Sequence, residues 1–501
     1  MKLTDRLALH AAKRPDLVAL SWPDGQLNYA DLLRQIEVNA RALSTKGCKS
    51  LALDVANGPA WIVLDLAALE LGICLIPLPP FFSAAQLHHI LRHSGAEAVI
   101  TDNPDRLRML AGELLSDAQA NHTMLQQRLT WITTAPEIAG RAASLPAGVA
   151  KITYTSGTTG EPKGVMLSWP QMHQVAASLA AVVELGPHDR HLTLMPLAVL
   201  LENIGGVYAP LWAGATIVLL PGKETGLSGS SEIDGNRLVQ ALRLSCATTL
   251  ILTPQLLLAV TEVLEDNPEI RLNLRFAAVG GAPLSARLLQ RSLAAGVPVF
   301  EGYGLSECAS VVCLNTPQQQ RPGSVGKPLP HVRLAISGGG EVLIGGQPFS
   351  GYLGERAPAS DHWATGDLGE LDSDGFLYLR GRRSNMFVTA FGRNIAPEWV
   401  ERELTLEPEI LQAAVFGEAR PYNVAIIVAK AGSSAADIER ALQRANSSLP
   451  DYARIARWIT AHAPFSTGNR QLTGTGRIRR TSLLQHYQRT LDAIYFENQT
   501  P

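Results

Sequence analysis

Apolar runs with the length of buried strands alternate with helical segments in two parts of the chain, and this alternation constrains the fold more than any other feature. The first series predicts strands at 50–55, 72–78 and 98–101 and helices at 60–71 and 83–94. The second predicts strands at 216–220, 249–252 and 276–279 and helices at 236–245, 254–265 and 285–295. Such alternation is typical of parallel sheets with helices on both faces, so we expect an α/β fold. The Gly- and Ser-rich stretch 222–235 is expected to be a mobile surface loop.

The pattern changes after about residue 321 of the 501-residue chain. Short strands separated by glycine clusters are predicted at 332–337, 341–344 and 376–379, which indicates a β-rich subdomain. Helices return at 397–404 and 435–447, together with strands at 413–417 and 424–429. We therefore predict a large N-terminal domain over 1–381, a hinge at 382–384 and a small mobile α+β domain over 385–501.

Charge, hydropathy and cysteine content bear on the partners of the chain and on the compartment in which it works. The 43 basic and 45 acidic residues give a net charge of −2, which favours neither nucleic acid nor an anionic membrane. The most apolar stretch, 192–220, is interrupted by prolines and polar residues, so no transmembrane segment is expected. The charged first residues do not resemble a signal peptide. Five thinly spread cysteines without a CxxC pair indicate reduced thiols in a cytoplasmic protein.

The strongest local motif is YTSGTTGEPKGV at 154–165. Its glycines allow backbone N–H groups to turn around an anion, its hydroxyls add donors, and Lys163 adds positive charge. The motif is not the Walker pattern, because Gly164 follows the lysine where that pattern needs Ser or Thr. We interpret it as a phosphate-binding loop that uses Thr155, Ser156, Gly157, Thr158, Thr159, Gly160 and Lys163.

This loop resembles the signature of the adenylate-forming superfamily, which includes acyl-CoA synthetases, luciferases and the adenylation domains of peptide synthetases. Further motifs follow in the family's order: GGAP at 280–283, GYGLSE at 302–307, TGD at 365–367 and Gly381-Arg382. The resemblance implies an ATP site made of Gly281, Ala282, Pro283, Gly302, Tyr303, Gly304, Ser306, Asp367 and Arg382. Within it, Tyr303 would stack on adenine, Ser306 would contact the α-phosphate, Glu307 would hold Mg²⁺, and Asp367 would bind the ribose.

The chemistry of adenylation suits these residue types. A carboxylate attacks the α-phosphate of ATP and pyrophosphate leaves, so two anions must meet while negative charge grows on the leaving group. Such a reaction needs a metal ion, backbone donors and cations that are positioned in advance. Lys163, Glu307 with its metal, and Arg382 are groups of the required kinds.

The segment 381–401 resembles bacterial long-chain fatty acyl-CoA synthetases, and it also implies a thiolation loop at Phe391 and Gly392. Between Asp189 and Glu232 the only acids are Glu202 and Glu224, and neither takes the place of the aspartate that holds an α-ammonium in the amino-acid branch. An apolar acyl pocket at Ala198, Val199 and Gly205 is therefore predicted, although this run is also compatible with plain core packing.

Three departures from the family pattern are visible. Acyl-activating relatives usually carry histidine where Val199 stands. At the hinge, two residues after the motif arginine, relatives often carry Asp or Lys, whereas this chain has Ser384. The C-terminal lysine that bridges carboxylate and ATP is replaced by Arg477, and the only lysine after residue 384 is Lys430. Arginine keeps the charge but differs from lysine in geometry. The alternative for Arg477 is a solvated basic patch with Arg479 and Arg480.

The sequence thus predicts an AMP-forming acid–thiol ligase that activates a fatty or other apolar acid with ATP and Mg²⁺, with coenzyme A as the favoured thiol. Two alternatives stay open at this point. One is an acyl-AMP ligase that loads the phosphopantetheine of a carrier protein, and the other is a catalytically weakened protein that binds nucleotide or acyl ligands. Acyl chain length and oligomeric state are not determined by the sequence.

Overall fold

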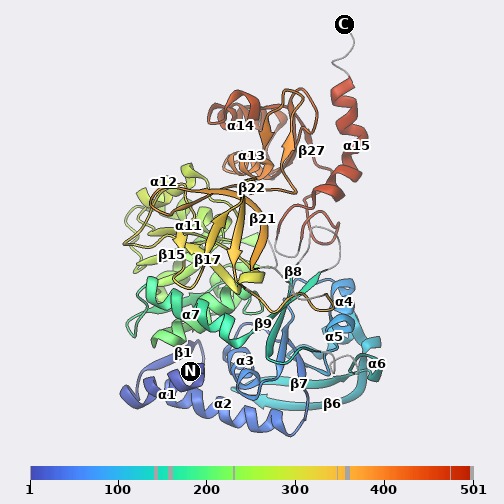
Figure 1. Cartoon of the computed structure of the whole chain (residues 1–501). Coiled ribbons are helices and arrows are strands. Elements are labelled where there is room, and N and C mark those ends of the chain that lie inside the picture. The colour runs from blue at the N-terminus through green and yellow to red at the C-terminus, as the bar shows by residue number, and fades with distance from the viewer. Residues whose placement is uncertain are drawn as a thin grey trace.

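The computed structural model describes residues 2–139, 145–155, 162–228, 232–346, 348–355, 361–473 and 476–496. Two large mixed sheets form its N-terminal part, and a smaller C-terminal unit lies at the top of Figure 1. Within the described ranges, no helix has the length and apolar character needed to cross a membrane. All five cysteines lie within them, and none forms a disulfide.

The first sheet has seven strands in the order β6-β7-β5-β3-β4-β8-β9. Its central strands are parallel: β3 (Ser50–Asp54), β4 (Cys74–Pro77), β5 (Ala98–Thr101) and β8 (Val149–Thr155). Antiparallel strands extend both edges: β6 (Leu115–Met124), β7 (Gln127–Thr134) and β9 (Lys163–Ser168). The helices of this part of the chain are α3 (Pro59–Leu71), α4 (Ala84–Ser94), α5 (Pro104–Ala111), η1 (Gly112–Leu114) and α6 (Pro136–Ala139).

The second sheet has nine strands in the order β18-β17-β16-β15-β14-β10-β11-β1-β2. Six neighbouring strands are parallel: β1 (Val18–Trp22), β11 (Thr216–Leu219), β10 (Arg190–Thr193), β14 (Thr249–Leu252), β15 (Phe276–Val279) and β16 (Val299–Leu305). The edge strands β2 (Gly25–Asn28), β17 (Ser310–Leu314) and β18 (Lys327–Pro328) are antiparallel. Its helices are α1 (Leu3–Lys13), α2 (Tyr29–Ser44), α7 (Trp169–Val182), α8 (Ala209–Ala213), α10 (Gly235–Leu244), α11 (Pro254–Asp266) and α12 (Ala286–Ala294).

Local sequence signals mark several of these helices. Ser83 caps α4 by accepting a hydrogen bond from the backbone N–H of Gln86, and Gly95 ends the helix in the left-handed conformation. Thr253 caps α11, and Pro254 occupies the first helical position, where its missing N–H costs nothing. The α/β architecture and the helices on these sheets are therefore as the alternating pattern predicted.

A four-stranded antiparallel sheet follows, with β19 (Leu334–Ile336), β20 (Glu341–Gly345), β21 (His362–Leu371) and β22 (Leu377–Arg382). The C-terminal unit then contains β23 (Phe387–Val388), β24 (Asn394–Ile395), α13 (Pro397–Leu404), β25 (Ile410–Phe416), β26 (Asn423–Ala429), α14 (Ala435–Ser447), η5 (Asp451–Ala453), β27 (Ile455–Thr460) and α15 (Arg480–Phe496). Two apolar clusters drawn wholly from residues 387–495 give this unit a core of its own. The domain limits at 381 and 385 stay a prediction, which this separate core supports.

Two elements differ from the sequence-based expectation. The stretch 222–235 was expected to be a loop, yet it contains a helical turn, α9 (Gly222–Thr225), and the strands β12 (Leu227–Ser228) and β13 (Glu232–Ile233). Its tip at 229–231 lies outside the described residues. The run after Leu201 winds into a π-helix, η3 (Glu202–Tyr208), which apolar spacing alone did not reveal.

Candidate active site

Strands β8 and β9 form an antiparallel pair that carries the predicted phosphate loop. Thr155 ends β8 and lies opposite Lys163, the first residue of β9. The connecting residues Ser156, Gly157, Thr158, Thr159 and Gly160 lie outside the described residues. The two ends of the predicted loop are therefore fixed by strand pairing, as a hairpin-like phosphate loop requires.

Lys163 and Glu307 are brought to the same place by a tyrosine that the motif analysis did not single out. Lys163 Nζ lies 2.9 Å from Glu355 Oε1 and 4.8 Å from the centre of the Tyr352 ring. The Tyr352 hydroxyl donates a 2.6 Å hydrogen bond to Glu307 Oε1. Burial and the nearby Glu307 carboxylate raise the pKa of Tyr352 well above its usual value, so its hydroxyl stays a donor.

Tyr352 reaches this position because residues 350–353 pair with β9. The N–H of Met166 donates to the carbonyl of Gly351 at 3.0 Å, and the N–H of Leu353 donates to the carbonyl of Gly164 at 2.8 Å. Segments far apart in the chain meet here, and no local sequence pattern predicts such a contact.

The predicted adenine and ribose residues also meet. The Tyr303 hydroxyl donates a 2.6 Å hydrogen bond to Asp367 Oδ2, and Arg382 Nε lies 3.7 Å from Asp367 Oδ1. Asp367 and Arg382 are register partners in the pair β21–β22. Burial and the Asp367 carboxylate raise the pKa of Tyr303 far above its ordinary value, which keeps its hydroxyl protonated.

Gly304 permits a close approach of two strands at this site. A methyl carbon added there would lie 1.7 Å from the backbone oxygen of Ser310, and the pairing of β16 with β17 shifts register at this point. At Gly302, an added carbon would meet Leu314 at 2.9 Å. Ser306 and Glu307 follow at once in the short helical turn η4 (Ser306–Cys308). The glycines therefore let the backbone present these two residues beside Tyr303.

Arg477 reaches the same region from the C-terminal unit. Its Nη2 donates to the carbonyl oxygen of Gly281 at 3.3 Å, and Gly281, Ala282 and Pro283 are exposed. The Arg477 side chain is exposed, and desolvation by the neighbouring protein together with the Arg382 charge lowers the pKa of its guanidinium. An arginine remains charged under these conditions. The guanidinium therefore adds positive charge to a region that already holds Arg382.

The predicted thiolation loop takes no part in this arrangement. Phe391 is 75% exposed at the turn between β23 and β24, and Gly392 has φ of +72°. The predicted hinge residue Ser384 is also exposed, directly after β22. Arg477 therefore contacts the Gly281 segment while Phe391 points into solvent, and the roles of both residues stay predictions.

The three predicted acyl-pocket residues differ in surroundings. Ala198 is 6% exposed within the main apolar core, whereas Val199 and Gly205 are partly accessible. A carbon added at Gly205 would lie 2.9 Å from Ile251 Cδ1 of β14. Val199 and Gly205 thus remain the better candidates for contact with a substrate, and the role of all three stays a prediction.

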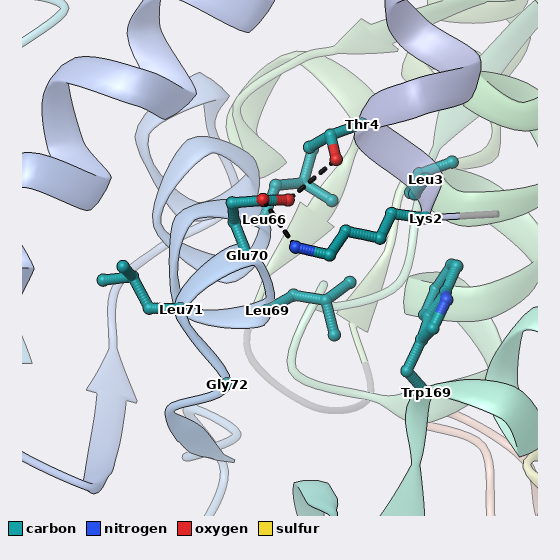
Figure 2. Close-up of a pocket in the computed structure, with 9 residues that line it drawn as sticks. All are labelled: Lys2, Leu3, Thr4, Leu66, Leu69, Glu70, Leu71, Gly72 and Trp169. Atoms are coloured by element: carbon teal, nitrogen blue, oxygen red, sulfur yellow. Dashed lines mark hydrogen bonds and ion pairs between the residues drawn. The ribbon is translucent and has the colours of Figure 1, made fainter.

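Figure 2 shows a pocket in another part of the molecule. It lies between the start of α1, the end of α3 and Trp169, and Glu70 accepts hydrogen bonds there from Lys2 and Thr4. None of the predicted site residues lines it. The candidate site is therefore defined by the convergence of charged side chains rather than by this pocket.

The described residues contain no group of three or more His, Cys, Asp or Glu side chains arranged for a metal ion. A Mg²⁺ ion commonly binds through one or two carboxylates together with substrate phosphates and water. Glu307, whose Oε1 accepts the hydrogen bond of Tyr352, is chemically suited to that mode. The residues present fit a metal that arrives with a nucleotide.

Comparison with known proteins identifies the chain's relatives. Residues 7–355 match the AMP-binding enzyme family, and residues 385–499 match the AMP-binding enzyme C-terminal domain. A long-chain-fatty-acid–CoA ligase of Mycobacterium bovis is 28% identical and covers 95% of this chain and 92% of its own. A 2-succinylbenzoate–CoA ligase of Bacillus licheniformis is 27% identical over 82% of this chain and 86% of its own.

Among solved structures, an anthranilate CoA ligase in complex with anthranoyl-AMP is similar, with a TM-score of 0.77 and 20% identity over 97% of both chains. At this identity the likeness concerns the fold. It confirms the predicted α/β architecture with a separate C-terminal unit, and the family matches confirm the resemblance on which the sequence interpretation was based.

Proposed function

Because this chain belongs to the AMP-binding enzyme family and is an AMP-forming acid–thiol ligase, we propose that it converts a fatty or other apolar carboxylic acid into its CoA thioester. Enzymes of this class use ATP, Mg²⁺ and CoA. The observation that carries the site assignment is a chain of contacts. Lys163 and Glu307 meet at Tyr352, Tyr303 is hydrogen-bonded to Asp367, and the Arg477 charge interacts with both Asp367 and Glu307.

In the first half-reaction, the ring of Tyr303 supports adenine and Asp367 accepts hydrogen bonds from the ribose hydroxyls. Lys163 leaves Glu355 and turns to the phosphates. A carboxylate oxygen of the acid attacks the α-phosphorus, the bond to the bridging oxygen breaks, and pyrophosphate leaves. The metal held by Glu307 would neutralise phosphate charge, and Arg477 would bridge the acid and the α-phosphate.

In the second half-reaction, the CoA thiolate attacks the acyl carbonyl carbon and AMP leaves with the oxygen that joined it to the acyl group. The thiol proton passes to solvent. The C-terminal unit would rotate about Ser384, which withdraws Arg477 and brings Phe391 and Gly392 to the site. A small residue at this position can absorb the backbone change.

The choice of an apolar acid rests on the surroundings of Val199 and Gly205. The only acid of the run between β10 and β11 is Glu202. It is fully buried and hydrogen-bonded to His191, so it is not available to hold a substrate ammonium group. The curated relatives described above are named for both a fatty acid and an aromatic diacid. We propose the fatty or otherwise apolar acid because Val199 and Gly205 offer it no charged partner.

The test is acid-dependent release of pyrophosphate across fatty, aromatic and amino acids, with and without CoA. We expect medium or long saturated acids to react faster than acetate, alanine or phenylalanine, and thioester to form only with CoA. Lys163→Ala and Glu307→Ala should each lower acyl-AMP formation by a factor that corresponds to about 3–4 kcal/mol. A faster reaction with an amino acid would overturn the substrate assignment. Thioester on a carrier protein but not on CoA would overturn the acceptor.

We also propose that the enzyme works in the cytoplasm. Its five cysteines are free, and three of them, Cys74, Cys308 and Cys313, are buried, as expected for structural thiols in a reducing compartment.

A further inference from the structure

The π-helix η3 lies between the two large sheets and carries Gly205 of the predicted acyl pocket. Every one of its residues other than Gly205 is buried, including the polar Glu202, Asn203 and Tyr208. A π-helix of this length is uncommon and is often associated with functional sites. The polar side chains on this helix therefore call for an explanation.

On one side, η3 is held by a buried cation of the seven-stranded sheet. Lys151 of β8 is 1% exposed, and its Nζ lies 2.8 Å from Oδ1 of Asp65, which lies on α3 and is also 1% exposed. Nζ also donates to Asn203 Oδ1 and, at 3.2 Å, to the Tyr208 hydroxyl. Asn203 Nδ2 and the Tyr208 hydroxyl each donate to Asp65 Oδ2 at 2.9 Å. The four side chains form a closed network.

On the other side, η3 is held by the nine-stranded sheet. His191 Nε2 of β10 lies 3.1 Å from Glu202 Oε1, and Glu202 Oε2 accepts the N–H of Met195 at 3.3 Å. The Glu202 carboxylate folds back over Gly206, where an added methyl carbon would lie 2.3 Å from Oε1 and 2.7 Å from His191 Nε2. Gly206 is therefore the residue that makes room for the contact between His191 and Glu202.

Stability alone does not account for these pairs. A buried ion pair loses hydration, and well-packed apolar residues of similar volume often give equal or greater stability. Burial lowers the pKa of Lys151 while the Asp65 charge opposes this shift, so the pair carries a cost of lost hydration as well as a gain from attraction. Directed polar contacts fix the position of each partner, and apolar packing does so less strictly.

We propose that Lys151 with Asp65, and His191 with Glu202, are positioning residues that hold η3 at a fixed place between the two sheets and thereby set which acyl chains the enzyme accepts. The inference rests on the proposed function, because it takes the η3 segment as a wall of the acyl pocket. Lys151 also lies on the strand that ends at Thr155, so the network ties the acyl helix to the base of the phosphate loop.

The test replaces the network by apolar residues in the double variant Lys151→Met/Asp65→Leu, so that no charge is left buried alone. The matched control is Arg106→Met/Asp54→Leu, which removes a 3.0 Å ion pair between Asp54 of β3 and Arg106 of α5. The other hydrogen bonds of these two side chains within the described residues involve Thr101 and Pro80 rather than η3. For both, kcat and KM are measured for ATP and for saturated acids of increasing length, together with the melting temperature.

We expect the Lys151 double variant to raise the KM for the preferred acid about tenfold and to flatten the chain-length profile, since one methylene in an apolar pocket changes specificity by about 10-fold or more. The KM for ATP should change less than about twofold. A raised KM for the acid with an unchanged KM for ATP would show that only binding of the acid is weakened. The control should keep the wild-type profile. Gly206→Ala, which displaces Glu202 without touching Lys151, should shift the profile in the same way.

An unchanged chain-length profile in folded Lys151→Met/Asp65→Leu and Gly206→Ala would overturn the inference, whatever their melting temperatures. If the double variant does not fold, Tyr208→Phe, which removes one hydroxyl from the network, takes its place under the same criterion. Failure of the proposed function looks different, because the wild-type enzyme would then release no pyrophosphate with any apolar acid.

Discussion

At the residue scale, the Tyr303 hydroxyl orients Asp367 through their 2.6 Å hydrogen bond. Tyr303→Phe keeps the ring that would support adenine but leaves the carboxylate without this donor. We expect the KM for ATP to rise about 5–10-fold, which corresponds to about 1–1.5 kcal/mol, the upper part of the range for an ordinary hydrogen bond. Steady-state pyrophosphate release measures this, with Tyr378→Phe on β22 as a control. An equal effect in both variants would contradict the role of Tyr303.

Arg477 takes the place where the sequence analysis expected the family's C-terminal lysine, and its contact with Gly281 makes this prediction testable. We expect Arg477→Ala to slow adenylation far more than acyl transfer from preformed acyl-AMP, because only the first step needs the guanidinium beside the acid and the α-phosphate. Arg477→Lys should keep or raise the adenylation rate. Single-turnover assays of each half-reaction measure both effects. If adenylation is unchanged in Arg477→Ala, the side chain is a surface charge.

A wild-type enzyme that forms no acyl-AMP while Arg477→Lys does so would point to a catalytically weakened protein. This outcome is possible because a planar guanidinium and a compact ammonium group present their donors differently to the same two oxygens.

At the element scale, the pairing of β16 with β17 depends on Gly304. In Gly304→Ala, the new methyl group would overlap the Ser310 carbonyl, so one of the two strands must move. We expect a loss of about 1–3 kcal/mol of stability together with weaker ATP binding. In the control Gly280→Ala, the nearest atom to the added methyl group is 3.5 Å away, which is an ordinary contact. Thermal melting and ATP titration of both variants test the expectation. Equal stability of the two would contradict it.

Element bounds followed from sequence where a local signal marks them. The helices Pro397–Leu404 and Ala435–Ser447 and the strand Phe276–Val279 have the predicted limits. A proline at the first helical position marks α13, and Ser434 caps α14.

The strands β6 and β7 were not predicted, because polar residues such as Asn121 and His122 conceal the strand pattern. The site residues likewise fall into those that a local motif predicts and those that it does not. Motifs located Tyr303, Glu307 and Asp367, whereas Tyr352, Glu355 and the Lys151 network depend on contacts between distant segments and leave no local pattern.

At the scale of the whole molecule, the two domains are joined by contacts that a rotation would break. Arg287 of α12 lies 2.7 Å from Oε1 of Glu407, whose other oxygen is held by Arg444 of the C-terminal unit. Leu406 packs in the same apolar cluster as α11 and α12. These contacts favour the arrangement in which Arg477 reaches Gly281.

Arg287→Ala should therefore slow adenylation about fivefold, equivalent to about 1 kcal/mol, and leave acyl transfer unchanged or faster. Glu407 keeps Arg444 as a partner in this variant, so we expect little loss of stability. Arg291→Ala, which removes a pair with Glu265 inside the large domain, is the control. Single-turnover rates of the two half-reactions decide the matter. Equal slowing of both would show that the contact does not select between conformations.

The pair formed by Lys163 and Glu355 gives nucleotide binding the character of an ion exchange. A phosphate oxygen that binds Lys163 replaces a carboxylate that the protein already holds, and that carboxylate returns to water. At this contact, added salt weakens both the pair that is lost and the pair that is gained. The affinity for ATP should consequently respond less steeply to ionic strength than the charge of the nucleotide alone suggests, because the empty enzyme already carries its own substitute anion.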